Sequence, residues 1–358
     1  PELRKRVLFT LGAIAVFRIG ASIPIPGVNG DAIRAIFNAQ SGSLLGFLNT
    51  FSGGALARFS IFSMGVVPYI NASIIMSLLQ GAHVLPFLDR LAKDGELGRR
   101  KLNSYTRYLT LFLAVFQSFG LTIAITKMQA PGGMPTVIDP SVMFYCVTVL
   151  TMTAGTIFVM WLGEQITEQG IGNGVSLLIF TGIVESIPAA GYGLFELVRL
   201  EEINLFYALG IIAVLAAVIV VVVWVETAQR KIPVQYAKRM VGRKMYGGSQ
   251  SYLPLKVDQS GVIAVIFALS LLSVPVTIAT FMPQNSSTSE SLMRFFQGGN
   301  YIYDAIYAGL IIFFCYFYNS VSINPVDLAE NMKKSGGFIP GIRPGEPTAK
   351  HIEWILER

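Results

Sequence analysis

Few residues in the chain have types and spacings suited to acid–base, nucleophilic or metal chemistry. The two histidines, His83 and His351, fall in stretches between apolar segments. Cys146 and Cys315 lie apart in apolar runs, where small core residues are common and the spacing of metal ligands is lacking. The sequence contains neither a His-Glu-x-x-His motif nor a phosphate-binding loop with its lysine. We therefore predict that the chain is not an enzyme and uses no cofactor or metal.

Charged residues beside apolar stretches are the remaining candidates for chemistry. Glu164 and Glu168 precede the glycines Gly170, Gly172 and Gly174. These glycines allow two helix ends to turn sharply and pack closely, and carboxylates near helix termini stabilise such a turn. We expect structural capping here rather than a metal site.

Arg18 is the one basic residue predicted to lie within a membrane span. A charge inside a membrane is a functional candidate by default. However, Arg18 lies near the outer end of its apolar stretch, where a long side chain reaches the interface. We favour this second interpretation.

The elements that must position these residues are membrane spans. Of the 358 residues, 53% are hydrophobic and only 13% are charged, against roughly 25% charged in soluble domains. A span needs about 20 mostly apolar residues. Stretches of this kind lie near 7–23, 60–81, 107–126, 141–162, 175–190, 206–225, 261–281 and 301–320. The predicted fold class is therefore all-α, a polytopic transmembrane helix bundle.

Orientation follows from the basic residues. Most of the 27 Lys and Arg fall at the N-terminus, in the loop after the second span, in the loop 226–260 and in the tail 321–358. Since cytoplasmic loops are enriched in Lys and Arg, these segments and both termini of the chain are predicted to be cytoplasmic.

The segment between the first two spans is not a simple loop. It opens with a stiff Pro-containing turn at residues 23–27 and continues with an amphipathic stretch at Asp31–Gln40. The apolar stretch Leu44–Phe51, which is too short to span, follows. Two interpretations stay open, an interfacial helix or a segment folded back into a cavity covered by protein or water.

The loop 226–260 and the tail form the candidate docking surface. The loop combines basic residues, among them Arg243 and Lys244, with tyrosines, and the tail presents Arg343 between prolines and glycines. Such a surface suits RNA or an acidic protein, although orientation alone also requires a basic loop.

Several long segments in this order resemble the SecY family, the channel-forming subunits of the bacterial Sec translocon. They are residues 17–27 (FRIGASIPIPG), 51–56 (FSGGAL), 98–108 (GRRKLNSYTRY), 161–174 (WLGEQITEQGIGNG), 253–257 (LPLKV) and 338–345 (FIPGIRPG).

This resemblance implies two pseudo-symmetric halves of five spans around a central pore. Residues 1–205 would hold spans one to five, with a plug segment near 43–57. Residues 206–358 would hold spans six to eight, with cytoplasmic loops 226–260 and 321–358, and the ninth and tenth spans would follow. The second half would thus be incomplete in this chain.

Site residues are carried over from the same resemblance. The plug would include Leu44, Leu45, Phe47, Leu48 and Phe51. The apolar pore ring would consist of Val66, Ile70, Val175, Ile179 and Ile266. Asn71 and Gln117 would belong to a lateral gate, and Arg243, Lys244 and Arg343 would bind cytoplasmic partners.

The implied function is a protein-conducting channel of the bacterial plasma membrane, which translocates secretory polypeptides and releases membrane segments sideways. Its implied partners are the small subunits SecE and SecG, the SecA ATPase, the ribosome, signal sequences, unfolded preproteins and lipids. From the residues alone, a secondary transporter with broken helices and an assembly scaffold without a conduit remain alternatives. A transporter needs ionisable groups at membrane depth, which the predicted spans almost entirely lack.

Overall fold

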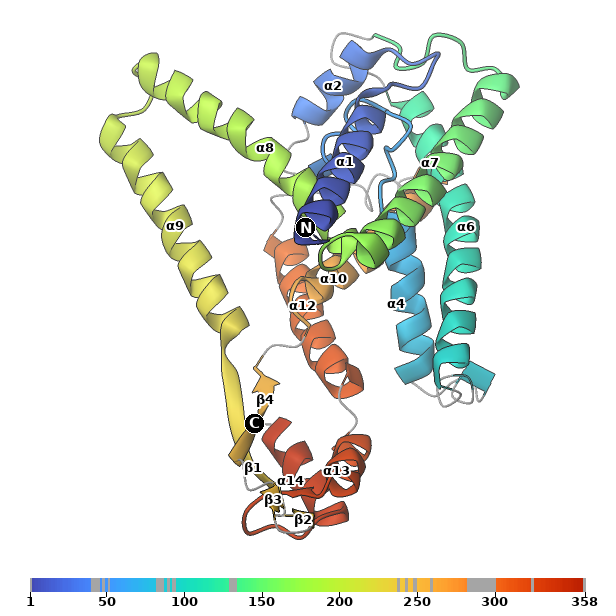
Figure 1. Ribbon diagram of the computed structural model, residues 1–358. Coiled ribbons are helices and arrows are strands. Elements are labelled where there is room, and N and C mark those ends of the chain that lie inside the picture. The colour runs from blue at the N-terminus through green and yellow to red at the C-terminus, as the bar shows by residue number, and fades with distance from the viewer. Residues whose placement is uncertain are drawn as a thin grey trace. The chain divides into compact units, whose positions relative to one another are not determined.

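The computed structural model describes residues 2–39, 46, 49–50, 52–81, 87–88, 91, 95–128, 134–236, 239–241, 244–246, 250–257, 260–281, 301–322 and 325–356. Helices make up most of this part of the chain (Figure 1). They are α1 (Glu2–Ser22), α2 (Gly30–Ala39), α4 (Val67–Gly81), α6 (Gly95–Lys127), α7 (Val142–Gln169), α8 (Gly174–Arg199), α9 (Leu205–Thr227), α10 (Val262–Phe281), α12 (Tyr301–Ser322), α13 (Pro325–Lys334) and α14 (Glu346–Leu356). Among the described residues, 5 helices are long and apolar enough to cross a membrane. The predicted helical membrane fold is confirmed.

Every predicted span contains a helix, but the second one begins later than expected. Residues 52–66 form turns, and α4 starts only at Val67. Phe59 has φ 46° and Gly65 has φ 52°, which is left-handed backbone that no α-helix can contain. The apolar composition of residues 60–66 therefore reflects burial in turns rather than in a helix.

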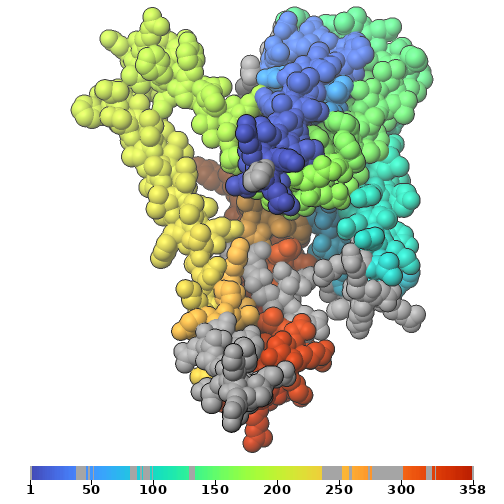
Figure 2. Space-filling view, in the orientation of Figure 1, coloured from blue at the N-terminus to red at the C-terminus, as the bar shows by residue number. Residues whose placement is uncertain are grey.

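The chain divides into two compact units, Pro1–Leu200 with Leu269–Tyr307, and Glu201–Ala268 with Ala308–Arg358. In the first unit α4 packs on α6 and α6 on α7, and α7 contacts α8 at the turn that joins them (Figure 1). The helix α1 also lies against α7, and Figure 2 shows its atoms in contact with those of α7 on the visible face.

Non-helical backbone of the first unit is held by an apolar core and by short pairings. Ile25 donates its backbone N–H to the Phe59 carbonyl at 2.9 Å, and Ile61 donates to the Ile23 carbonyl at 3.1 Å. The buried cluster around them draws on α2, α6, α7 and the turns: Ile25, Ile33, Phe37, Leu56, Phe59, Ile125, Val137, Phe144 and Met152. The Pro-containing segment is thus an extended strip that pairs with the turns before α4.

The turn from α7 into α8 is as tight as its glycines predict. A Cβ at Gly174 would lie 2.0 Å from the Gly163 carbonyl oxygen, so only glycine allows this approach. Asn173 caps α8 by accepting a hydrogen bond from the Ser176 N–H at 3.2 Å. The Thr167 hydroxyl accepts from the Gly174 N–H at 2.9 Å. Asn173 and Thr167, rather than the expected carboxylates, stabilise this turn.

In the second unit α9 continues into a small mixed domain (Figure 1). The strand β1 (Gln229–Tyr236) pairs antiparallel with β4 (Gln250–Lys256), with Ile232 opposite Leu253, and also with β5 (Gly337–Phe338). A separate pair joins β2 (Arg239–Val241) to β3 (Lys244–Tyr246). Along β1, Ile232 and Val234 are buried while Lys231 and Pro233 are exposed, which is the alternation of a sheet with one covered face.

The covered face of this sheet packs on α13 and α14. The shared cluster contains Ile232, Val234, Leu255, Met332, Ile339, Ile352 and Ile355. Ile352 is completely buried and lies one helical turn from both Thr348 and Ile355. The loop and the tail, which are distant in sequence, therefore form one structure, named here the loop–tail domain (residues 229–256 and 325–356).

The remainder of the second unit includes parts of α10 and α12. The Phe267 ring meets the Phe314 ring edge to face, with centroids 5.5 Å apart. The Ser260 hydroxyl donates to Cys315 Sγ at 3.3 Å. Cys315 is half-buried, whereas Cys146 on α7 is exposed, so the expectation that both cysteines are core residues is wrong for Cys146.

Candidate channel site

Four of the five residues predicted for the pore ring lie in the first unit. Ile70 donates its backbone N–H to the Val66 carbonyl at 3.0 Å, so the two side chains are one turn apart at the start of α4. Val175 and Ile179 have the same spacing on α8. Val66 and Ile179 are buried, and Ile70 and Val175 are half-buried. Each pair presents branched apolar side chains on one face of its helix.

Ile266 is half-buried on α10 and belongs to the second unit. The ring composed of all five residues therefore stays a prediction.

The two residues predicted for the lateral gate lie on adjacent helices. Asn71 is on α4 and is 8% exposed, and Gln117 is on α6 and half-buried. Within the described part of the chain, neither Asn71 Oδ1 nor Gln117 Oε1 accepts a hydrogen bond, although both atoms are buried. A buried carbonyl oxygen without a donor costs about 1–3 kcal/mol. Both residues are thus poised to accept a donor from another segment.

The residues assigned to the plug, Leu44, Leu45, Phe47, Leu48 and Phe51, lie outside the described residues. The loop that follows them is described, and it is tightly bonded to itself. Asn49 accepts from the Ala57 N–H through its side chain at 2.8 Å and from the Gly54 N–H through its carbonyl at 2.9 Å. We call residues 49–58 the plug-base loop.

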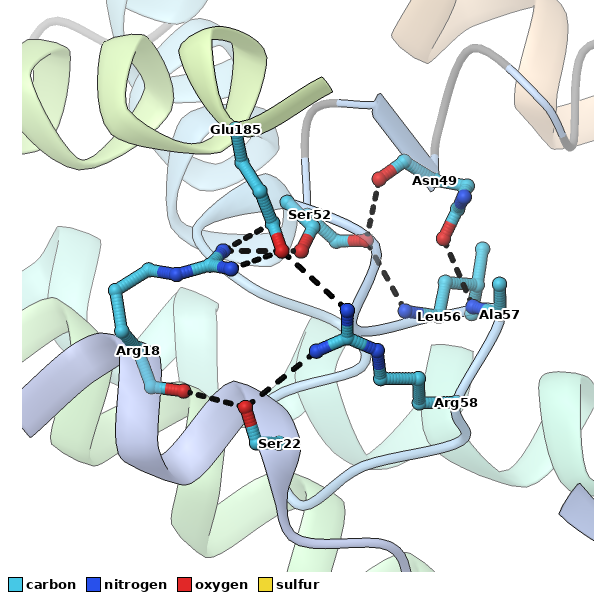
Figure 3. Close-up of polar contacts among 9 residues, drawn as sticks. Arg18, Ser22, Asn49, Ser52, Leu56, Ala57, Arg58 and Glu185 are labelled. Atoms are coloured by element: carbon cyan, nitrogen blue, oxygen red, sulfur yellow. Dashed lines mark hydrogen bonds and ion pairs between the residues drawn. The ribbon is translucent and has the colours of Figure 1, made fainter. Parts of the chain in front are cut away.

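Ser52 completes the internal bonding of the plug-base loop. Its hydroxyl donates to the Asn49 carbonyl at 3.0 Å and accepts from the Leu56 N–H at 3.2 Å (Figure 3). Gly53 and Gly54 have φ 66° and 72°, which is why two glycines occur at this tight turn. These bonds join residue 49 to residues 52, 54 and 57, and residue 52 to residue 56, within the described part of the loop.

Arg18 lies beside this loop and is paired with a carboxylate, a partner that the sequence analysis did not predict. Its guanidinium forms a two-pronged ion pair with Glu185 of α8 and donates a further hydrogen bond to the Gly53 carbonyl at 3.2 Å (Figure 3). Arg58 approaches the same carboxylate, with Nη2 3.4 Å from Oε1. The α1 helix, the plug-base loop and α8 are therefore joined at one carboxylate.

Sequence reasoning missed Glu185. This carboxylate lies near the middle of the fifth predicted span, so the predicted spans are less poor in ionisable groups than expected. Its occurrence there, together with Arg18 in another span, was the available signal, because such charges pair with one another.

Glu164 has a different partner from the one expected. Arg107 donates from Nε to Oε1 and approaches Oε2 with Nη2, both at 2.9 Å. In the described part of the chain, no group of three or more His, Cys, Asp or Glu side chains is suited to holding a metal ion.

Arg343 lies in the loop–tail domain on an ordered turn. The Thr348 hydroxyl donates to the Arg343 carbonyl at 2.9 Å, and the neighbouring Ile342 packs against the apolar cluster of the domain. The Arg343 side chain is exposed. The turn thus presents this guanidinium to solvent.

Lys244 and Arg243 are the other two residues predicted to bind partners. Lys244 lies on β3 with its backbone opposite Val241, while Arg243 lies outside the described residues.

The family model of SecY matches residues 60–358. The chain belongs to the SecY family. A SecY protein translocase subunit from Aquifex aeolicus (strain VF5) is 47% identical over 358 residues, which cover 100% of this chain and 82% of the relative. The corresponding subunit from Escherichia coli (strain K12) is 46% identical over 359 residues, covering 100% of this chain and 80% of the relative.

Solved structures share the SecY fold at lower sequence identity. One described as a protein-conducting channel has a TM-score of 0.69 and 16% identity, with 99% of this chain and 82% of that chain covered. A SecY structure whose description concerns the plug domain and the closed state has a TM-score of 0.66 and 18% identity, covering 99% of this chain and 82% of the other. Sec61 in a canine ribosome–channel complex has a TM-score of 0.61 and 16% identity, covering 99% and 81%.

The chain is accordingly a subunit of a protein-conducting channel in a membrane. Membership of this family decides between the alternatives that the residues alone left open, and a secondary transporter is not favoured.

Proposed function

We propose that residues 43–57 plug a conduit whose constriction is formed by Val66, Ile70, Val175, Ile179 and Ile266. The observation that carries this proposal is the run of buried, non-helical backbone at residues 52–66. Ala55, Leu56, Phe59 and Phe62 are at most 4% exposed in turns. In a membrane protein such backbone is tolerated only where protein covers it or where it lines a water-filled cavity.

The proposed ring works by excluding water. Branched apolar side chains around a narrow passage make a constriction that dewets, so ions are resisted while a sliding polypeptide can separate the side chains. The i, i+4 spacing of Val66 with Ile70 and of Val175 with Ile179 supports this role, because the two apolar side chains of each pair lie on the same side of the chain, one helical turn apart.

The lateral gate is proposed to sort segments by their transfer free energy. Leu or Ile favours lipid by about 0.3–0.6 kcal/mol per residue, while Lys or Asp at the centre costs about 2.5–3.5 kcal/mol. A sufficiently apolar segment therefore leaves sideways and a polar chain passes through. The unmet oxygens of Asn71 and Gln117 support their assignment to this gate, where a partner segment would supply the donors.

The channel is proposed to lie in the bacterial plasma membrane with both termini of this chain cytoplasmic. SecE and SecG would be its membrane partners, and it would itself catalyse no reaction. The driving force would come from the SecA ATPase or the ribosome, bound through Arg343, Lys244 and Arg243. The exposed Arg343 on its rigid turn supports this assignment, because guanidinium groups recognise phosphates and carboxylates in two-pronged fashion.

Crosslinking tests the conduit directly. In a complete translocase with Cys146→Ser and Cys315→Ser, single Ile70→Cys or Ile266→Cys changes are combined with a cysteine placed mid-chain in a stalled preprotein. Val214→Cys on the exposed face of α9 is the control. Disulfides at residues 70 and 266 but not at 214 are expected. Efficient translocation without a disulfide at either ring position would contradict the assigned path.

A further inference from the structure

Glu185 is a carboxylate in a helix otherwise suited to a membrane. It lies near the middle of α8, so its charge cannot reach either end of the helix. A carboxylate in such a position requires a partner, because removal from water disfavours an unpaired charge strongly. Its partners are Arg18 and Arg58, which come from two other segments.

The ion pairs are shielded from solvent without being fully buried. The side chains of Glu185 and Arg18 are 24% and 27% exposed, and that of Arg58 is 35% exposed. Electrostatic attraction at such a site is stronger than in bulk water and falls sharply if water enters. The ion pairs of Glu185 with Arg18 and Arg58 are therefore strong in the present packing and weaken when water enters the site.

Backbone contacts place the plug-base loop against α8 at the same point. A Cβ at Gly53 would lie 3.0 Å from Gly182 Cα and 3.1 Å from Arg18 Nη1. Gly182 precedes Glu185 by three residues, so both lie on one face of α8. Gly53, whose carbonyl accepts from Arg18, thus lies between α1 and α8.

The internal bonds of the plug-base loop pass this restraint on to the residues before it. The loop is attached to Glu185 at two residues. Arg58 contacts the carboxylate directly, and Gly53 is attached to it through Arg18. In the same loop, Ser52 bonds to Asn49 and Leu56, and the Asn49 side chain accepts from the Ala57 N–H, next to Arg58 (Figure 3). Moving residue 49 away from α8 therefore requires that the loop deform or that both attachments break.

We propose that Glu185 is a positioning residue that latches the plug-base loop to α8 through Arg18 and Arg58. This inference rests on the proposed plug function of residues 43–57. Opening the conduit admits water, which weakens the ion pairs that hold the loop, so the latch resists small displacements and releases after a large one. The latch thereby sets how strong a signal sequence must be to open the channel.

The test compares charge-neutralising variants with matched controls in the complete translocase. The variants Glu185→Gln and Arg58→Gln remove one partner each. Glu196→Gln makes the same change at an exposed position of α8, and Arg34→Gln makes it on the exposed face of α2. Anion leak through resting translocase in proteoliposomes and export of a reporter with a defective signal sequence are measured.

We expect Glu185→Gln to raise both quantities on the order of tenfold over the controls, as fits the loss of a shielded ion pair. Glu185→Asp, which keeps the charge, should restore most of the stringency. The double variant Glu185→Gln/Arg58→Gln should exceed Glu185→Gln only slightly, because both changes remove one interaction. Membrane levels of each variant establish that the channel assembles.

A further variant separates the latch from the plug. Residues 44–48 are replaced by a Gly/Ser linker, which leaves Asn49 and the other bonded residues of the plug-base loop in place. If this replacement raises the leak while Glu185→Gln behaves like Glu196→Gln, the latch is overturned and the plug assignment stands. If neither change raises the leak, the plug assignment and the latch both fail, while the crosslinking at Ile70 and Ile266 reports independently on the conduit.

Discussion

Arg107 on α6 grips the carboxylate of Glu164 on α7 with two parallel contacts, each 2.9 Å long. This fork geometry matches a planar guanidinium to a planar carboxylate, which Lys cannot do. The ion pair links two of the long helices, α6 and α7. On α6 it lies where the apolar part of the helix begins.

We expect Arg107→Ala to lower the apparent Tm of the purified translocase by about 1–3 °C, since an exposed but well-aligned pair contributes up to about 1 kcal/mol. The measurement is thermal aggregation followed by size-exclusion chromatography. Lys101→Ala, an exposed cation on the same helix, is the control. Equal melting of the two variants would show that the pair contributes nothing.

Gly174 carries a sharper prediction. Its Cβ position is 2.0 Å from the Gly163 carbonyl oxygen, so Gly174→Ala must push α8 away from α7. Overpacking against backbone costs about 1–3 kcal/mol. The yield of assembled translocase should fall several-fold.

Gly191→Ala is the matched control on the same helix, because a Cβ there meets nothing within 4 Å. Alanine is favoured over glycine in a helix by about 1 kcal/mol, so this variant should be neutral or slightly stabilising. A normal yield for Gly174→Ala would mean that the tight turn is not required.

The gate prediction concerns Asn71 and Gln117. If their buried oxygens are met by a donor across the gate, Asn71→Leu and Gln117→Leu remove that polar contact and ease opening. Export of preproteins with defective signal sequences should then rise several-fold, since a net hydrogen bond contributes about 0.5–1.5 kcal/mol.

Asn103→Leu, at an exposed position of α6, controls for the added apolar surface. Unchanged stringency in both gate variants would remove Asn71 and Gln117 from the gate.

Arg343 tests whether the loop–tail domain is a docking surface. Because its side chain is exposed, Arg343→Glu should leave the melting of the domain unchanged. Binding to ribosomes should weaken, and the slope of log affinity against log salt should become shallower by about 1.

Lys350→Glu changes the same charge at an exposed position of α14 and serves as the control. Ribosome binding that is equally weakened by both changes would indicate a general charge effect rather than recognition by Arg343.

The approximate positions and the helical state of the apolar segments were predictable from sequence, although only 5 helices among the described residues are long and apolar enough to cross a membrane, against eight predicted spans. Long apolar runs such as residues 206–225 have no stable alternative to helix in a membrane, because every backbone polar group must be satisfied within the segment. The second span was predicted too long at its start, because residues 60–66 are as apolar as a span. Their turns depend on burial against Ile25, Phe144 and other distant residues.

The loop–tail domain shows the same limit. Basic residues at 226–260 and at 333–358 indicated a docking surface, but not that the two segments fold together. The two segments associate because Ile232 and Val234 of the loop pack in one cluster with Ile352 and Ile355 of the tail. No local sequence pattern predicts which of these distant side chains come into contact.

The sequence by itself determined that this is a helical membrane protein, and its long motifs indicated the family, because hydrophobic length and motif order are properties of the chain alone. Tertiary structure alone decided that Arg18 and Glu185, which are 167 positions apart, share an ion pair and that the plug-base loop lies against them. Which charges meet depends on how separate helices pack, and helix packing is a property of the folded chain that residue types and spacings do not specify.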